Sequence, residues 1–134
     1  MATIARFEDI EAWQTTRELT RQIYDLTRHG EFARDFGLRD QMRRASVSIM
    51  SNIAEGFEGR TRHLFIEYLG RAKASAGELR AQLYVAKDIN YINQAEFSQL
   101  FELCDKSSRQ ISRFIQYLEQ QPNAIREEGI EYNV

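Results

Sequence analysis

The stretch from Phe65 to Ala86, FIEYLGRAKASAGELRAQLYVA, decides the fold, because its apolar and small residues recur at alternating intervals of four and three. This spacing puts them on one side of an α-helix and makes a heptad seam of the kind that packs helix against helix. The seam consists of Phe65, Leu69, Ala72, Ala76, Leu79, Leu83 and Ala86. We therefore expect a long helix whose seam is covered by other helices.

Helical periodicity extends over most of the chain, and no long segment alternates like a strand. The expected helices cover residues of about 9–28, 38–55, 61–89 and 93–120. Gly30 and Gly56 are typical of helix ends, Thr61 is an expected N-cap, and Asn93 with Glu96 has the spacing of a capping box.

Four long helices with short connections are most simply arranged as an antiparallel up-down-up-down bundle. The sequence thus predicts an all-α fold with one domain over residues 1–121 and a polar C-terminal tail at 122–134.

The composition is that of one globular domain. Of the 134 residues, 43% are hydrophobic and only one is proline. No apolar run reaches the roughly 18 residues of a membrane span, and the first residues lack the apolar core of a secretory signal. A single cysteine excludes an internal disulfide. We expect a cytoplasmic protein without a membrane partner.

The second expected helix contains RRASVSIMSNIAEG, Arg43–Gly56, in which the ten residues 45–54 carry no charge although 28% of the chain is charged. A surface helix normally keeps a charged face. The third expected helix also has a back of small residues, including two interior glycines that cost about 1 kcal/mol each relative to alanine.

Backs rich in apolar or small residues on two neighbouring helices predict that another protein surface covers them, most economically a second copy of the chain. The expected interface residues are Val47, Met50, Ala54, Gly70, Ala74, Gly77 and Ala81. The alternative is that these are scattered apolar surface residues, which are common in monomers.

The same segments resemble the bacterial four-helix bundle proteins called ribosomal RNA intervening-sequence proteins. The signature of that family is matched at Gln41, Arg43, Arg44, Ala45, Ser48, Ile49, Asn52, Ile53, Ala54, Glu55 and Gly56. Its third helix is matched at Phe65, Leu69, Ser75, Glu78, Leu79, Gln82 and Leu83. The similarity extends from about Phe7 to Leu118.

The resemblance implies a bundle that assembles as a homopentameric ring and has no known enzymatic activity. A more distantly similar protein, the accessory protein of diversity-generating retroelements, is a pentamer with a basic surface that binds a reverse transcriptase and nucleic acid. RNA or an RNA-associated protein is therefore an expected partner by analogy. A protein scaffold without nucleic-acid contact is the alternative.

Basic residues gather in the middle of the chain, where seven Lys and Arg stand against four Asp and Glu between Arg39 and Lys73, although the whole chain has a net charge of −2. The candidates for an anion or nucleic-acid contact are Arg43, Arg44, Arg60, Arg62 and Arg71. Ion pairs with nearby glutamates are the simpler interpretation, because the carboxylates are as numerous. These are Glu55, Glu58, Glu67 and Glu78.

Two residues of the signature have expected structural roles. Asn52, at the edge of the apolar stripe, is expected to fix helix register. Glu55 lies near a helix C-terminus, where an anion is unfavourable, so we expect an arginine partner for it: Arg60, Arg62 or an arginine of a neighbouring chain.

The patterns of common catalytic sites are missing. Di-iron bundles use Glu-x-x-His motifs, whereas His29 and His63 follow Leu26 and Arg60 at that spacing. Neither a P-loop nor a Gly-rich nucleotide turn is present. Cys104 falls in the apolar stripe of the fourth helix and is expected to be a small core residue. We therefore expect no catalysis, no metal and no cofactor.

Overall fold

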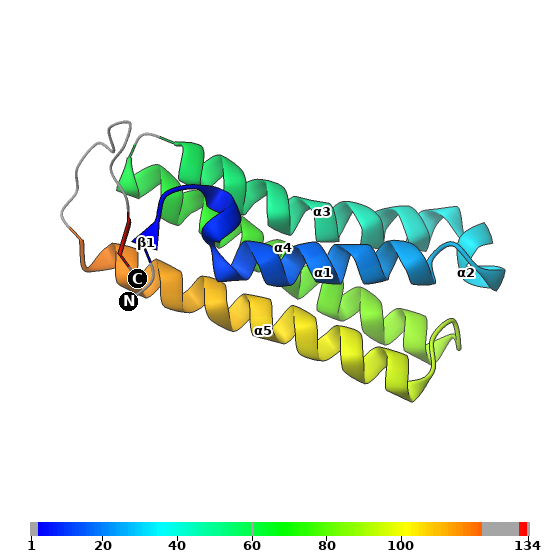
Figure 1. Ribbon diagram of the computed structural model, residues 1–134. Helices are drawn as coiled ribbons and strands as arrows, with labels where there is room; N and C mark the ends of the chain where they lie inside the picture. The colour runs from blue at the N-terminus through cyan, green and yellow to red at the C-terminus, as the bar shows by residue number, and fades with distance from the viewer. Residues whose placement is uncertain (1–2, 60, 122–131, 134) are drawn as a thin grey trace.

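The computed structural model describes residues 3–59, 61–121 and 132–133. Four long helices lie side by side along the molecule (Figure 1). They are α1, Glu11–Leu26; α3, Phe36–Glu58; α4, Arg62–Asp88; and α5, Gln94–Glu119. Each packs against the next long helix in the chain, and α5 also packs against α1, which closes the bundle. The predicted all-α bundle is confirmed.

Short elements complete the two ends of the bundle. At one end, the two-residue strands β1, Thr3–Ile4, and β2, Tyr132–Asn133, pair antiparallel and bring the start and end of the chain together (Figure 1). The 3-10 helix η1, Phe7–Asp9, leads from β1 into α1. At the other end, the five-residue helix α2, Gly30–Arg34, connects α1 to α3.

The predicted heptad seam of α4 lies in the centre of the core, where every one of its seven residues is at most 1% exposed. Side chains from the other three long helices cover it, among them Leu19, Ile49 and Ile111, which are fully buried. Burial of such side chains is the main term that holds helices together in a bundle.

Two predicted caps are confirmed. The Thr61 side chain accepts a hydrogen bond from the Leu64 amide at 3.1 Å at the start of α4. Asn93 and Glu96 form both bonds of a capping box at the start of α5. These bonds satisfy amide groups that the first turn of a helix leaves without partners.

The prediction that Gly56 ends its helix is wrong. α3 continues to Glu58, and Gly59 is its C-cap. Gly56 is buried inside the helix, and a Cβ there would lie 2.9 Å from both Phe65 Cδ1 and Tyr68 Cβ of α4. The glycine is needed because α4 crosses closely at this point.

The first predicted helix, 9–28, is longer than α1, and the expectation that Gly30 ends it is wrong. The helix ends at Leu26 with Thr27 as its C-cap. Gly30 has a φ of 62°, a conformation that favours glycine, and it begins α2. Of the predicted polar tail, residues 122–131 and 134 lie outside the described residues, and Tyr132–Asn133 form β2. None of the described helices is both long and apolar enough to cross a membrane.

Candidate functional site

The predicted interface residues fall into two groups on the outside of the bundle. The α3 patch consists of Val47, Met50 and Ala54; Val47 is 39% exposed, and the other two are half-buried. The α4 patch consists of Gly70, Ala74, Gly77 and Ala81, of which Gly77 is half-buried and the others are exposed. The next turn extends the α4 patch with Val85, which is 47% exposed.

The glycines of the α4 patch have no packing role within the chain. A Cβ at Gly70 would meet nothing within 4 Å, and one at Gly77 would meet only the tip of the Arg80 side chain, at 3.8 Å. Gly56 differs, because its missing side chain makes room for α4. The intrachain structure therefore gives no reason for two glycines that weaken the middle of α4.

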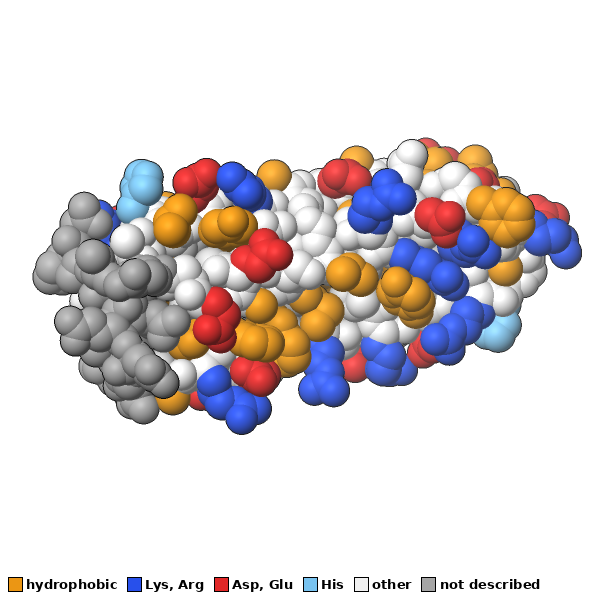
Figure 2. Space-filling model, turned by 90° about the horizontal axis from the view of Figure 1, so that it is seen from above, with side chains coloured by type: hydrophobic (Ala, Val, Ile, Leu, Met, Phe, Trp, Pro, Cys, Tyr) orange, Lys and Arg blue, Asp and Glu red, His pale blue; other side chains and the backbone are white. Residues whose placement is uncertain are grey.

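A charged strip separates the two patches. α3 and α4 meet where the Ser48 and Ser75 hydroxyls lie 3.0 Å apart. With 3.6 residues per turn, exposed charged residues lie next to Ser48 on α3 and next to Ser75 on α4. The α3 patch lies on the far side of the charges of α3, and the α4 patch lies on the far side of the charges of α4. The charged strip consists of Arg44, Glu55, Glu67, Arg71 and Glu78. Figure 2 shows uncharged surface between scattered charges on the face that contains α3.

Two signature residues, Ser48 and Asn52, lie at the junction of α3 with α4. The Asn52 side-chain amide donates to Ser48 O at 2.8 Å and to Ser48 Oγ at 3.1 Å, and Ser48 in turn contacts Ser75. Gln41 and Glu55 are exposed, and Glu55 makes no ion pair with a described residue. Because Ala45, Ile49 and Ile53 are buried, the signature is divided among the core, contacts between helices and the surface.

The predicted anion-contact arginines do not form one cluster. Residues 43 and 58 are 15 residues apart along α3, or about 22 Å at 1.5 Å per residue, and Arg62 begins α4 beyond that end. Figure 2 shows that the Lys and Arg side chains of its face gather over the half of the bundle nearer α2. Arg60 lies outside the described residues.

Three of these arginines have partners within the chain. Arg43 Nε donates to Thr27 Oγ1 at 2.8 Å, and its guanidinium lies over the Tyr24 ring. Arg62 Nη1 donates to the Leu118 carbonyl at 3.2 Å.

The third, Arg71, forms the i,i+4 ion pair with Glu67 at 2.9 Å, as the simpler interpretation predicted. Arg44 is exposed and has no ion pair with a described residue.

A second group of cations, which the sequence did not predict, lies between α4 and α5. A groove of about 390 Å³ between α4 and α5 is lined by Lys73, Arg80, Ser108, Arg109, Ser112 and Arg113. Lys73 and Arg80 are seven residues apart, and Arg109 and Arg113 are four apart, so each pair lies on one side of its helix. This spacing was the available signal, but the sequence does not show that the two helices present their cations to one groove.

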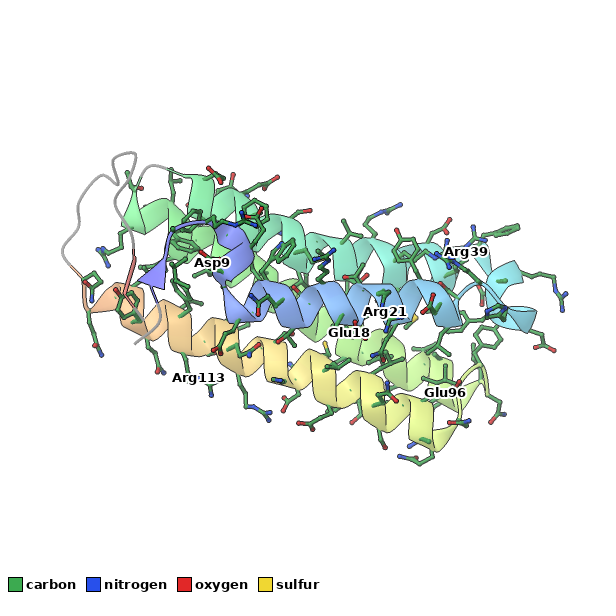
Figure 3. All side chains as sticks on the ribbon, in the orientation of Figure 1. Asp9, Glu18, Arg21, Arg39, Glu96 and Arg113 are labelled. Carbon is green, nitrogen blue, oxygen red and sulfur yellow. The ribbon has the colours of Figure 1, made fainter. Side chains whose placement is uncertain are left out.

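Ionisable groups elsewhere have structural partners. Burial raises the pKa of the Cys104 thiol to about 12, and the thiol donates to the Ala76 carbonyl at 3.2 Å. Hydrogen bonds from Arg21 and Gln22 lower the pKa of Glu18 to about 2. Glu18 and Arg21 lie side by side on the outside of α1 (Figure 3). Among the described residues, no three His, Cys, Asp or Glu side chains are grouped to hold a metal.

Comparison with solved structures supports the fold. A protein of unknown function from the S23 ribosomal protein family of Bacteroides thetaiotaomicron VPI-5482 superimposes with a TM-score of 0.73 at 20% identity. The match covers 78% of this chain and 95% of that one. No curated protein matches the sequence.

The 23S rRNA-intervening sequence protein model matches residues 8–113, which include the whole of the signature and the helix that carries the seam. The chain therefore belongs to the 23S rRNA-intervening sequence protein family.

Proposed function

We propose that the protein is a non-enzymatic, cytoplasmic interaction module that works as a homo-oligomer, with the α3 patch of one copy against the α4 patch of the next. The observation that carries this proposal is the pair of glycines in the α4 patch, Gly70 and Gly77, which no contact within the chain requires. A neighbouring helix that packs closely on them gives a reason for their presence, because small side chains let backbones approach.

The placement of the patches favours a ring. Because the charged strip separates them, the proposed contact gives one chain two different contact surfaces, one on each side of the α3–α4 junction. Contacts between unlike surfaces join copies head to tail and close into a ring when the rotation per copy permits it. A ring of five copies is the number that the family resemblance implies.

Light scattering tests the assembly. The wild-type chain is expected to have the mass of several copies, and Met50→Glu or Ala74→Glu is expected to reduce it to that of one copy, because each buries a carboxylate in a contact. Ala95→Glu, at an exposed position in the first turn of α5, is the matched control and keeps the wild-type mass. If the wild-type chain has the mass of a single copy, the proposed homo-oligomer is wrong.

Mixing the two glutamate variants tests whether the contact joins unlike patches. Met50→Glu leaves the α4 patch intact, and Ala74→Glu leaves the α3 patch intact. An equimolar mixture is therefore expected to form complexes of two chains, although neither variant associates alone. If the patches instead paired like with like, one variant would keep its assembly and mixing would add nothing.

We also propose that the partner of the assembly is RNA, or a protein that accompanies RNA. Support comes from cations without carboxylate partners on the described surface, including Arg44 of the charged strip and Lys73 of the α4–α5 groove. Assembly repeats these charges around the ring, which strengthens attraction to phosphate despite the acidic composition. If the assembly is a protein scaffold instead, it will bind no nucleic acid at low salt.

A further inference from the structure

Two helix segments beside most of the α4–α5 groove contain no carboxylate, and the groove extends on α4 beyond them, past Glu78, to Arg80. On α4 this applies to residues 68–77 and on α5 to residues 106–118; apart from Arg71, which lies in the charged strip on the α3 side of α4, these segments carry four Lys and Arg. The two helices pack side by side, so these four residues contribute to one positive surface in a chain whose net charge is −2. The groove between them has a volume of about 390 Å³ and is open to solvent.

The walls of the groove supply the groups that bind phosphate oxygens. Lys73 and Arg80 come from α4, and Arg109 and Arg113 come from α5. The hydroxyls of Ser108, which is 5% exposed, and of half-buried Ser112 add two donors at its base. Guanidinium, ammonium and hydroxyl groups are the usual partners of phosphate.

Carboxylates pair with two of the four cations of the groove, and the other two cations have no ion pair with a described residue. Asp105 pairs with Arg80 at 3.4 Å and with Arg109 at 2.5 Å, and Glu102 pairs with Arg109 at 3.4 Å. Lys73 and Arg113 make no ion pair with a described residue, and Arg113 projects outward from α5 (Figure 3). The four cations of the groove thus exceed the two carboxylates that pair with them by two charges.

We propose that the α4–α5 groove binds the phosphodiester backbone of a nucleic-acid strand without reading its bases. The residues that line the groove include no aromatic ring on which a base would stack and no amide or carboxylate that would read a base edge. Its open shape suits a strand that passes along the surface better than a small phosphate that needs enclosure. This inference rests on the nucleic-acid role proposed above. It assigns the phosphate contact to residues of the groove, none of which is among the arginines predicted from the sequence.

Binding of a labelled RNA strand, followed by fluorescence anisotropy at several salt concentrations, tests the groove. Lys73→Ala combined with Arg113→Ala is expected to weaken binding at least about tenfold at low salt. The slope of log affinity against log salt concentration is negative, and loss of two phosphate contacts is expected to reduce its magnitude by about 1.4. The matched control is Arg17→Ala combined with Arg28→Ala, which removes two exposed cations from α1 and its end and is expected to leave binding within about twofold.

The outcomes separate the groove from the wider role. If the double variant of Lys73 and Arg113 binds RNA with the wild-type affinity and the wild-type salt dependence, the groove is not the binding site. The proposed nucleic-acid role then still stands. Failure of the wild-type chain to bind RNA overturns both, whereas the mass measurements decide the assembly independently. DNA of the same sequence is expected to bind within about threefold of RNA, and a strong preference for either overturns recognition through phosphate alone. Circular dichroism checks that each variant remains helical.

Discussion

The hydroxyls of Ser48 in α3 and Ser75 in α4 lie 3.0 Å apart, which joins two helices through residues 27 positions apart in the chain. The Asn52 side chain donates to both polar atoms of Ser48, its carbonyl oxygen and its Oγ. Half-buried polar groups that satisfy one another define the register of two helices more sharply than apolar contacts do. The expected register role of Asn52 is thus best understood as part of this three-residue cluster.

Replacing members of this cluster tests its coupling. Ser48→Ala and Ser75→Ala are each expected to lower the free energy of unfolding by about 1 kcal/mol, because each removes an interhelical hydrogen bond. The double variant is expected to cost less than the sum, by about 0.5 kcal/mol or more. Urea unfolding measures all three. Ser51→Ala, at an exposed position of α3, is the control and should change little; additive losses would contradict the coupling.

Glycine-to-alanine substitutions should have opposite effects at two positions. Gly56→Ala is expected to destabilise the fold by about 1–3 kcal/mol, because its Cβ would lie 2.9 Å from Phe65 and Tyr68. Gly70→Ala is expected to stabilise the unassociated chain by up to about 1 kcal/mol, because its Cβ meets nothing there. Thermal unfolding followed by circular dichroism measures both, and loss of stability on Gly70→Ala in single chains would contradict the structure.

Arg62 is expected to stabilise the folded chain, whereas Arg44 is expected to contribute little to its stability. Arg62 Nη1 bonds the Leu118 carbonyl in the last turn of α5, and the buried Nε has no described partner. Arg62→Ala is therefore expected to lower the free energy of unfolding by about 1–2 kcal/mol. Arg44→Ala, which removes an exposed side chain, is expected to change it by less than about 0.5 kcal/mol. Chemical denaturation compares the two, and equal effects would refute the distinction.

Cys104 should be unreactive in the folded protein and should make stability fall in alkali. Because burial raises the thiol pKa from 9.0 to about 12, the folded state keeps the proton while the unfolded state loses it. The stabilisation is complete below pH 9 and is lost as pH rises from about 9 to 12, by at most about 1.4 kcal/mol per pH unit.

Cys104→Ala isolates this contribution from other groups that titrate in alkali. Its free energy of unfolding is expected to decline less steeply over that range than that of the wild-type chain. A thiol reagent at pH 8 is expected to label Cys104 only after denaturation. Fast labelling of the native protein would show that the thiol is accessible.

Local patterns predicted much of the fold. The heptad seam of α4 identified seven core residues, and Thr61 and Asn93 marked helix starts, because these features depend on residues within a few positions of each other. Gly56 was misread because glycine is favoured both beyond a helix end and where another helix crosses closely. The two situations differ only in the position of α4, which the local sequence does not contain.

The candidate sites were harder to predict, because they depend on pairs of residues far apart in the chain. Arg43 packs on Tyr24 and Arg62 bonds Leu118, so counts of nearby glutamates could not identify these partners. Lys73 and Arg113 likewise share a groove although 40 positions separate them. The uncharged backs of α3 and α4 could be recognised early, since a helix face follows directly from the residue spacing.

The two glycines of the α4 patch also bear on how the protein behaves in dilute solution. Each weakens its own helix without any return from the same chain, and in the assembly that we propose neighbouring copies supply that part of the folding energy. Under this proposal folding and association are thermodynamically linked, and we expect the melting temperature to rise with total protein concentration. A fall in the amount of the protein in a cell is then expected to disperse the proposed assemblies and to lower the stability of each chain at the same time.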